Sequence, residues 1–424
     1  MMGRGLKLQI GRRALAYNFL NLLAGSLASQ GVSTVVLLLT ARQLGAEGYG
    51  QYTASLALTG STAVLFNLGL DIWLLRNGAA GLALLSTFVG SVFLIKITLG
   101  WVWFLFIQVL LLLLRPENFP GGLVGLAAAS VWFNGLLATI LTTYKLSLKN
   151  RFTFFLQTLH VLIWLALTAA LITWNEHLPW AYMWVRTLAI FIVVMTGYIM
   201  LLKMGFLAPV RIRLATVRTI LRETIPFAIS DALAWILMRA DVLIIALLLD
   251  RKDVGVFSTA ENIVNMLFFV PAAAYEIFVP TLSYSLKNDV NRAQLFVRYG
   301  ICLFPLIGLL LILLVWICAP LLTNLLGTDF QEVRELLLIL CPVPFLHSLT
   351  FGAAAFLVAS GKQGQRTLVQ GLVAILNVGM NVIVAKPFGI KGISAVYAFT
   401  EAVLFLGYFM LARNVIYFKD NKRD

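Results

Sequence analysis

The chain alternates between long apolar stretches and short segments that hold most of its charged residues, glycines and prolines. A stretch of roughly 20 mostly apolar residues is long enough to cross a bilayer as a helix. These stretches are too long and too continuously apolar for the alternating strands of a membrane barrel. We therefore predict about twelve membrane-spanning helices, near residues 14–40, 50–75, 84–114, 122–144, 152–174, 181–202, 223–249, 255–284, 299–325, 331–358, 366–386 and 391–412.

Composition leads to the same class of protein. Of the 424 residues 61% are hydrophobic and 12% are charged, and the mean hydropathy is +0.93. Such a chain cannot expose enough polar surface to stay in water, and the apolar stretches leave little sequence for a soluble domain. The expected fold class is an all-α integral membrane protein.

Basic residues set the expected orientation, because lysine and arginine accumulate in cytoplasmic loops. With the N-terminus inside, most of the 32 basic residues fall on the cytoplasmic side, including those between Lys203 and Arg222. An even number of spans returns the C-terminus to the same side. We expect a multi-pass protein of the cytoplasmic (inner) membrane with both termini in the cytoplasm.

The formal net charge of +14 does not indicate nucleic-acid binding, because the basic residues are spread over many short loops. Anionic membrane lipids are the expected partners of these loops. Cys302, Cys318 and Cys341 lie within predicted spans, without the spacing of a metal site, and the three histidines are scattered. We expect no metal site.

The second half of the chain weakly repeats the first. At an offset of 205 residues, four residues of the first outer loop match four of a later loop: Leu44, Gly50, Tyr52 and Thr53 align with Leu249, Gly255, Phe257 and Ser258. Six plus six spans in the same orientation are typical of transporters built from two bundles. A chance match between short glycine-aromatic loops is the alternative.

Short motifs run through nearly the whole chain in a fixed order. They are LGAEGYGQY (44–52), NLGLDIWLLRNGA (67–79), IPFAISDALAWILMRADVLIIALLLDRKDVGVFSTAENI (225–263), VPTLS (279–283), LLGTDF (325–330), ASGKQ (359–363), LNVGMNV (376–382) and FGIKGIS (388–394). In this order and spacing they resemble the polysaccharide-biosynthesis, oligosaccharide-lipid flippase family of the multidrug, oligosaccharidyl-lipid and polysaccharide (MOP) exporter superfamily.

The resemblance implies a flippase that moves a polyprenyl-diphosphate-linked oligosaccharide between leaflets by alternating access. No bond is made or broken, so an enzyme is not expected. It also implies two six-helix lobes around a central hydrated cavity. We place the first lobe at residues 1–205 and the second at residues 206–424. Coupling to Na⁺ or H⁺ is common in the superfamily, and no other cofactor is expected. We expect a monomer, with association to glycan polymerase or glycosyltransferase machinery as a further option.

A diphosphate and a sugar need charge-assisted donors and hydrogen bonds to pass the hydrocarbon, so polar residues within spans are the first candidates. Arg239 is the strongest, because it is deep and can hold phosphate bidentately; an ion pair within its lobe is the alternative. The other candidates for binding substrate are Lys96, Gln370, Asn377, Asn381 and Asn18. Lys96 could instead reach the headgroups, and the amides could join helices by hydrogen bonds.

Acidic residues within spans are the candidates for ion coupling. Glu261 and Asn265 are four residues apart and so share one helix face. Asp241, Asp231 and Glu401 are further candidates, each with pairing inside its lobe as the alternative. Arg239 and Asp241 lie about 200° apart around their helix, so they cannot share a face.

Asp71 and Arg76 at the end of the second span are gate candidates or an end-of-helix charge pair. Two other functions compete with the flippase. A multidrug or organic-cation antiporter of the same superfamily would favour acidic cavity residues over a central arginine. A glycosyl polymerase or ligase would need a long outer loop with catalytic residues.

Overall fold

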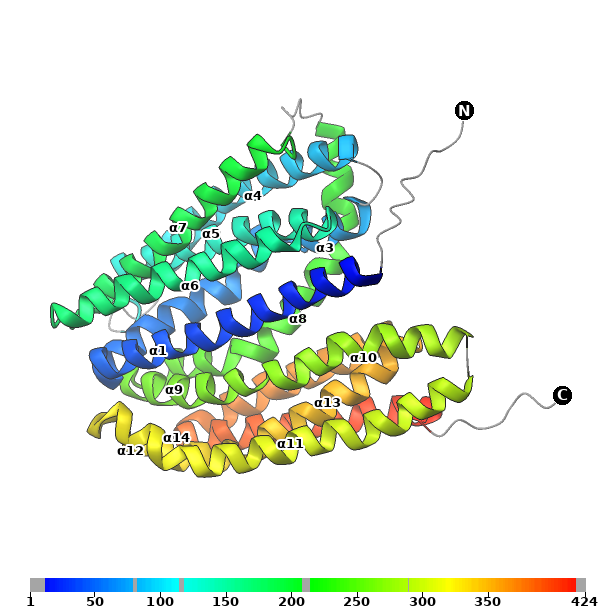
Figure 1. Ribbon diagram of the computed structural model, residues 1–424. Coiled ribbons are helices and arrows are strands. Elements are labelled where there is room, and N and C mark those ends of the chain that lie inside the picture. Colours follow the sequence, from blue (N-terminus) through cyan, green and yellow to red (C-terminus); the bar gives the residue numbers. More distant parts are fainter. Residues whose placement is uncertain (1–11, 79–81, 114–117, 208–213, 289, 417–424) are drawn as a thin grey trace. The chain divides into compact units, whose positions relative to one another are not determined.

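Every regular element in the part of the chain that the computed structural model describes, residues 12–78, 82–113, 118–207, 214–288 and 290–416, is a helix (Figure 1). The helices are α1 (Arg12–Thr62), α2 (Val64–Asn67), α3 (Leu70–Asn77), α4 (Leu82–Leu111), α5 (Gly121–Leu146), α6 (Asn150–Thr173), α7 (Pro179–Lys203), α8 (Leu214–Leu248), α9 (Arg251–Leu267), α10 (Phe269–Asn288), α11 (Val290–Leu326), the 3₁₀ helix η2 (Thr328–Phe330), α12 (Gln331–Leu340), α13 (Pro342–Ala359) and α14 (Gln363–Ile416). The predicted all-α class is confirmed.

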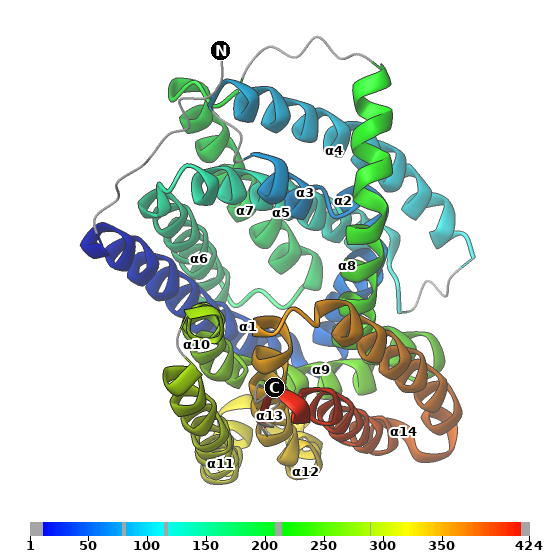
Figure 2. The same ribbon diagram turned by 90° about the vertical axis from the view of Figure 1, so that its right-hand side faces the viewer.

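Each of the twelve predicted spans falls on helical sequence, but the spans and the helices do not correspond one to one. The helix α14 holds two spans, and α1 holds the first and the beginning of the second, which continues through α2 and α3. The spans at 255–284 and 331–358 are each divided between two helices. A straight helix of the length of α14, 54 residues, would measure about 81 Å, far more than the roughly 30 Å of hydrocarbon. Gly389 breaks it with φ 57° and ψ −151°, angles that a side chain would strain. Figure 2 shows its orange and red parts as separate segments. Gly45 breaks α1 in the same way, with φ 67°.

Length and composition identify the membrane helices independently. Among the described residues eight helices are long and apolar enough to cross a membrane, and the bent pair Ser29–Asn67 and Leu70–Asn77 makes up to nine. On α11 the exposed apolar side chains follow helical spacing, at Leu306, Leu310, Leu313, Ile317 and Leu321. Such a stripe suits contact with acyl chains.

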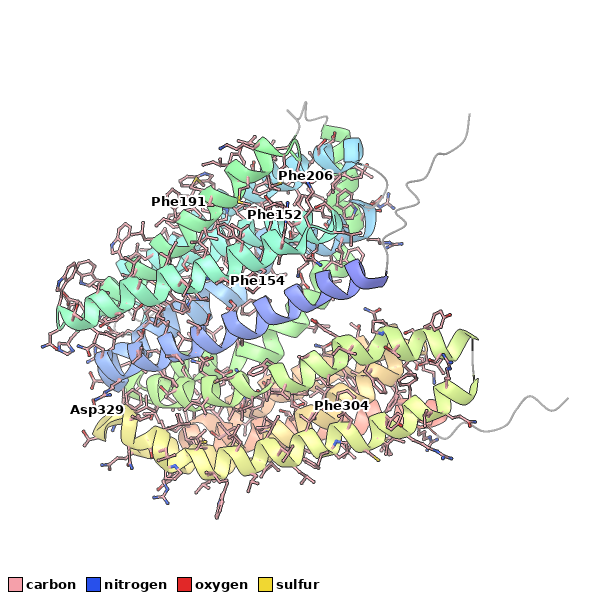
Figure 3. The ribbon with its side chains drawn as sticks, in the orientation of Figure 1. Phe152, Phe154, Phe191, Phe206, Phe304 and Asp329 are labelled. Carbon is pink, nitrogen blue, oxygen red and sulfur yellow. The ribbon has the colours of Figure 1, made fainter. Side chains whose placement is uncertain are left out.

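The described residues form two compact units. The first takes those within Met1–Val36 and Ser55–Ala232. In it α5 packs against α3, α4, α6 and α7. Phe152 and Phe206 lie toward the same end of this unit in Figure 3, and both rings pack on Tyr144, with centroids 5.4 and 6.3 Å away. Aromatic contacts of this kind fix how the helix ends meet.

The second unit takes Leu37–Ala54 and the described residues within Leu233–Asp424. Here α13 packs against α10, α11 and α14. Its core holds Phe278, whose ring meets Phe304 and Phe356 edge to face at 5.7 and 5.8 Å (Phe304 is labelled in Figure 3). The helix α8 contributes to both units. The expected lobe boundary at residue 205 stays a prediction.

Candidate substrate and ion-coupling site

In the second unit Arg239 of α8 forms an ion pair with Glu261 of α9. Its Nη1 lies 3.4 Å from Oε2 of Glu261, whose side chain is 2% exposed, while that of Arg239 is 34% exposed. Asn265, one turn along α9, also hydrogen-bonds the Glu261 side chain. A buried carboxylate requires such partners. The contact leaves much of the guanidinium accessible to another anion.

Asp241, two residues further along α8, is held by a chain of amides from α14. Asn381 donates from Nδ2 to Oδ1 of Asp241 at 2.6 Å and to Oδ1 of Asn377 at 3.2 Å. Asn377 then donates to Oγ1 of Thr400 at 3.3 Å. All four side chains are buried. The break at Gly389 makes this chain possible, because it lets Thr400 return to Asn377 along the same helix.

The second half of α14 connects to α9 and α13 as well. Tyr397 donates from Oη to Oδ1 of Asn265 at 3.3 Å. The carboxylate of Glu401 lies 2.9 Å from Nδ1 of His347. We name the set around α8, α9 and α14 the C-terminal polar network: Arg239, Asp241, Glu261, Asn265, Asn377, Asn381, Tyr397 and Thr400.

One acceptor in the C-terminal polar network is unsatisfied. Oδ1 of Asn381 is buried and has no hydrogen-bond partner among the described residues. Leaving a buried acceptor unpaired costs about 1–3 kcal/mol. The same amide group donates to Asp241 through its nitrogen. Asn381 therefore places an unpaired oxygen next to the buried carboxyl group of Asp241.

In the first unit Lys96 of α4 is completely buried and forms an ion pair with Asp71 of α3. Its Nζ lies 2.7 Å from Oδ2 of Asp71 and donates to the carbonyl oxygen of Gly135 at 2.8 Å. Thr139 donates from Oγ1 to the other Asp71 oxygen at 2.7 Å. The half-buried Asp231 interacts electrostatically with both charges of this pair. Lys96 therefore bonds within the helix bundle in this structure.

The remaining candidates lie apart from these contacts. Arg76 is exposed in the last turn of α3, while Asp71 bonds Lys96 and Thr139. Gln370 is half-buried on α14. Asn18 lies on α1, but its side chain is outside the described ones. The structure brings Arg239 next to Glu261 and Asp241 next to Asn381, and the roles of all these residues stay predictions.

Sequence reasoning did not find several of the residues that bond these charged and amide side chains. Thr139, Thr400 and His347 carry no motif, and each reaches a carboxylate or amide only through helix packing. Glu223 is not among the candidates from the sequence either, although its Oε2 accepts a hydrogen bond from the Trp73 indole at 2.7 Å. A polar residue among apolar neighbours was the one signal available for them.

Solved structures of membrane transporters share this fold. An inward-facing multidrug resistance MATE family transporter of the MOP superfamily matches with a TM-score of 0.73 and 14% identity, covering 91% of this chain and 94% of the other. The lipid II flippase MurJ in an inward closed conformation matches with a TM-score of 0.71 and 12% identity, covering 92% and 87%. The eukaryotic MATE transporter AtDTX14 matches with a TM-score of 0.65 and 15% identity, covering 95% of each chain.

These similarities show the fold, and together with the two family models that match the chain they define its class as an integral membrane transporter of the MOP superfamily. The family model of the polysaccharide biosynthesis proteins matches residues 15–285, and the chain belongs to that family. A second family model, MatE, matches residues 226–383. A search of curated protein sequences found no match. The family resemblance in the sequence motifs is thereby confirmed.

Proposed function

We propose that the protein is a flippase of the cytoplasmic membrane that moves a polyprenyl-diphosphate-linked oligosaccharide between leaflets by alternating access. The match to the polysaccharide biosynthesis family over residues 15–285 carries this proposal. The fold shared with the lipid II flippase MurJ supports it. No bond of the substrate changes, both termini face the cytoplasm, and the protein works as a monomer that receives lipid-linked glycan from the machinery that makes it.

Arg239 binds the diphosphate in this mechanism. Its guanidinium has five donors in a planar fork that matches phosphate oxygens. Its 3.4 Å contact with Glu261 is long for a charge-assisted bond, and the side chain is one-third exposed. A phosphate can therefore bind the Arg239 guanidinium without first breaking a short ion pair. Glu261 is then left as a buried carboxylate in need of a new cation.

Ion coupling follows from that need. When the diphosphate engages Arg239, a sodium ion or a proton compensates the carboxylates of Glu261 and Asp241. The unsatisfied Oδ1 of Asn381 supports this role for Asp241, since it offers an oxygen ligand to Na⁺ or an acceptor to a protonated carboxyl. Binding of the ion and binding of the substrate are thermodynamically linked, because both change the net charge of the C-terminal polar network.

A multidrug or organic-cation antiporter is the second candidate. The MatE model matches residues 226–383, which contain Arg239, Asp241 and Glu261. In this alternative the two carboxylates bind the organic cation, and Arg239 only neutralises Glu261 between cycles. Replacing Arg239 then leaves export largely intact, whereas in the flippase it removes the phosphate ligand.

Reconstituted vesicles test the proposal. Purified protein is placed in liposomes that contain a polyprenyl-diphosphate-linked oligosaccharide, and a membrane-impermeant lectin reports the glycan exposed on the outer surface. We expect protein-dependent movement of the glycan and no export of a fluorescent organic cation. Cation export without glycan movement would favour the antiporter and reject the flippase.

A further inference from the structure

A cavity of about 940 Å³ in the first unit adjoins the break between α2 and α3. Its lining comes from Leu68 at that break and from the first turns of α8: Arg218, Thr219, Leu221, Arg222, Glu223, Thr224 and Ile225. The lining is mixed. Two arginines and a glutamate provide charge, while Leu68, Leu221 and Ile225 provide an apolar surface. Such a wall suits a molecule with an ionic head and an apolar tail.

The two arginines of the cavity share one face of α8. Arg218 and Arg222 are four residues apart, about 40° around the helix, and both are exposed. Neither has an ion-pair partner among the residues that the structure describes. Two adjacent guanidinium groups without a carboxylate partner favour an anionic ligand with two charged groups.

The acidic residue of the cavity is already engaged. Glu223 accepts a hydrogen bond from the buried Trp73 indole of α3 at 2.7 Å. This contact ties α8 to α3 beside the cavity. Gly69 fixes the same side, because a Cβ on it would overlap the backbone of Phe227. The wall that presents Arg218 and Arg222 is therefore held firmly against the α2–α3 break.

We infer that this cavity binds the diphosphate head of an isoprenoid lipid, with Arg218 and Arg222 as its two phosphate ligands. The inference rests on the proposed function and adds a second phosphate site, separate in sequence from Arg239. Phosphatidylglycerol presents one phosphodiester charge, whereas a terminal diphosphate presents two adjacent phosphoryl groups to two adjacent guanidinium groups. The apolar side chains at 68, 221 and 225 accept the first isoprene units.

Direct binding tests the inference on the full-length protein in a neutral detergent. Farnesyl diphosphate is the probe, titrated by calorimetry. We expect the Arg218→Gln/Arg222→Gln double variant to bind it at least about tenfold more weakly, since hydrogen bonds to charged groups contribute about 1.5–3 kcal/mol. The Arg218→Lys/Arg222→Lys variant keeps the charges but loses the planar fork, so we expect intermediate affinity. Arg298→Gln, at an exposed arginine of α11, is the matched control and should bind as wild type.

Competitors identify the chemistry. Inorganic diphosphate should compete weakly, farnesol should not compete, and phosphatidylglycerol should compete poorly. Unchanged binding in the double glutamine variant would overturn the inference, as would equal loss in Arg298→Gln or equal competition by phosphatidylglycerol. These outcomes are separate from failure of the proposed function, which appears as absent glycan movement in vesicles even when farnesyl diphosphate binds to the two arginines.

Discussion

Gly50 and Gly255 each lie against the backbone of the other's helix. A Cβ on Gly50 would overlap the carbonyl oxygen of Arg251, and a Cβ on Gly255 would overlap the carbonyl oxygen of Ala46. The contact is reciprocal at one offset, since 251 − 46 and 255 − 50 both equal 205. Equivalent surfaces that meet each other are the mark of a twofold relation. The reciprocal contact supports the internal repeat inferred from the sequence.

Alanine at Gly50 or Gly255 should therefore destabilise the protein. Each methyl group would push two helix backbones apart, and overpacking of this kind costs about 1–3 kcal/mol. The midpoint of thermal unfolding in detergent measures the effect. Gly379→Ala is the control, because a Cβ there meets nothing within 4 Å. Equal midpoints for Gly50→Ala and Gly379→Ala would show that the close approach is not required.

The pair between the fully buried Lys96 and the partly exposed Asp71 should be more costly to break than an exposed pair. Lys96→Met leaves the Asp71 carboxylate, whose side chain is 25% exposed, without its cation. We therefore expect a loss toward the lower end of the about 3–5 kcal/mol that breaking a fully buried pair costs. Arg251→Gln removes the exposed Arg251–Glu47 pair of 3.1 Å, and exposed pairs contribute about 0–1 kcal/mol. Denaturant titration gives both free energies of unfolding. Similar values for the two variants would contradict the assigned burial.

Asp241→Asn should uncouple transport from its driving ion. The amide keeps nearly the same shape and can still bond Asn381, but it cannot take up a proton and gives a weaker ligand to Na⁺. The transport rate in vesicles should lose its dependence on an imposed Na⁺ or proton gradient. Asp329→Asn, at an exposed carboxylate of η2 (labelled in Figure 3), is the control. An ion dependence that survives in Asp241→Asn would remove this residue from coupling.

Much of the fold could be predicted from the sequence, because membrane spans depend on local composition. The twelve apolar stretches all lie on helix, and the amides at 377 and 381 share a face as their spacing required. Arg239 and Asp241, about 200° apart around α8 by helical geometry, each form a hydrogen bond with a different partner. Helical geometry alone decides features of this kind.

The pairing of charges could not be predicted in this way. Asp71 is 25 residues from Lys96 and Asp241 is 140 residues from Asn381, and which helices meet depends on packing of the whole unit. The sequence placed Asp71 beside Arg76 and allowed Lys96 to reach the headgroups. In the structure Lys96 and Asp71 form an ion pair. A buried charge without such a partner would carry a large desolvation cost.

The measurement that tests the account most directly is glycan movement by Arg239 variants in reconstituted vesicles. Wild type should expose a polyprenyl-diphosphate-linked oligosaccharide to an external lectin, Arg239→Gln should reduce the rate at least about a hundredfold, equivalent to some 2.7 kcal/mol, and Arg239→Lys should fall between. Arg251→Gln, which alters an exposed arginine in the same unit, should transport as wild type. Unchanged glycan movement in Arg239→Gln, or export of organic cations with no glycan movement in wild type, would contradict the account.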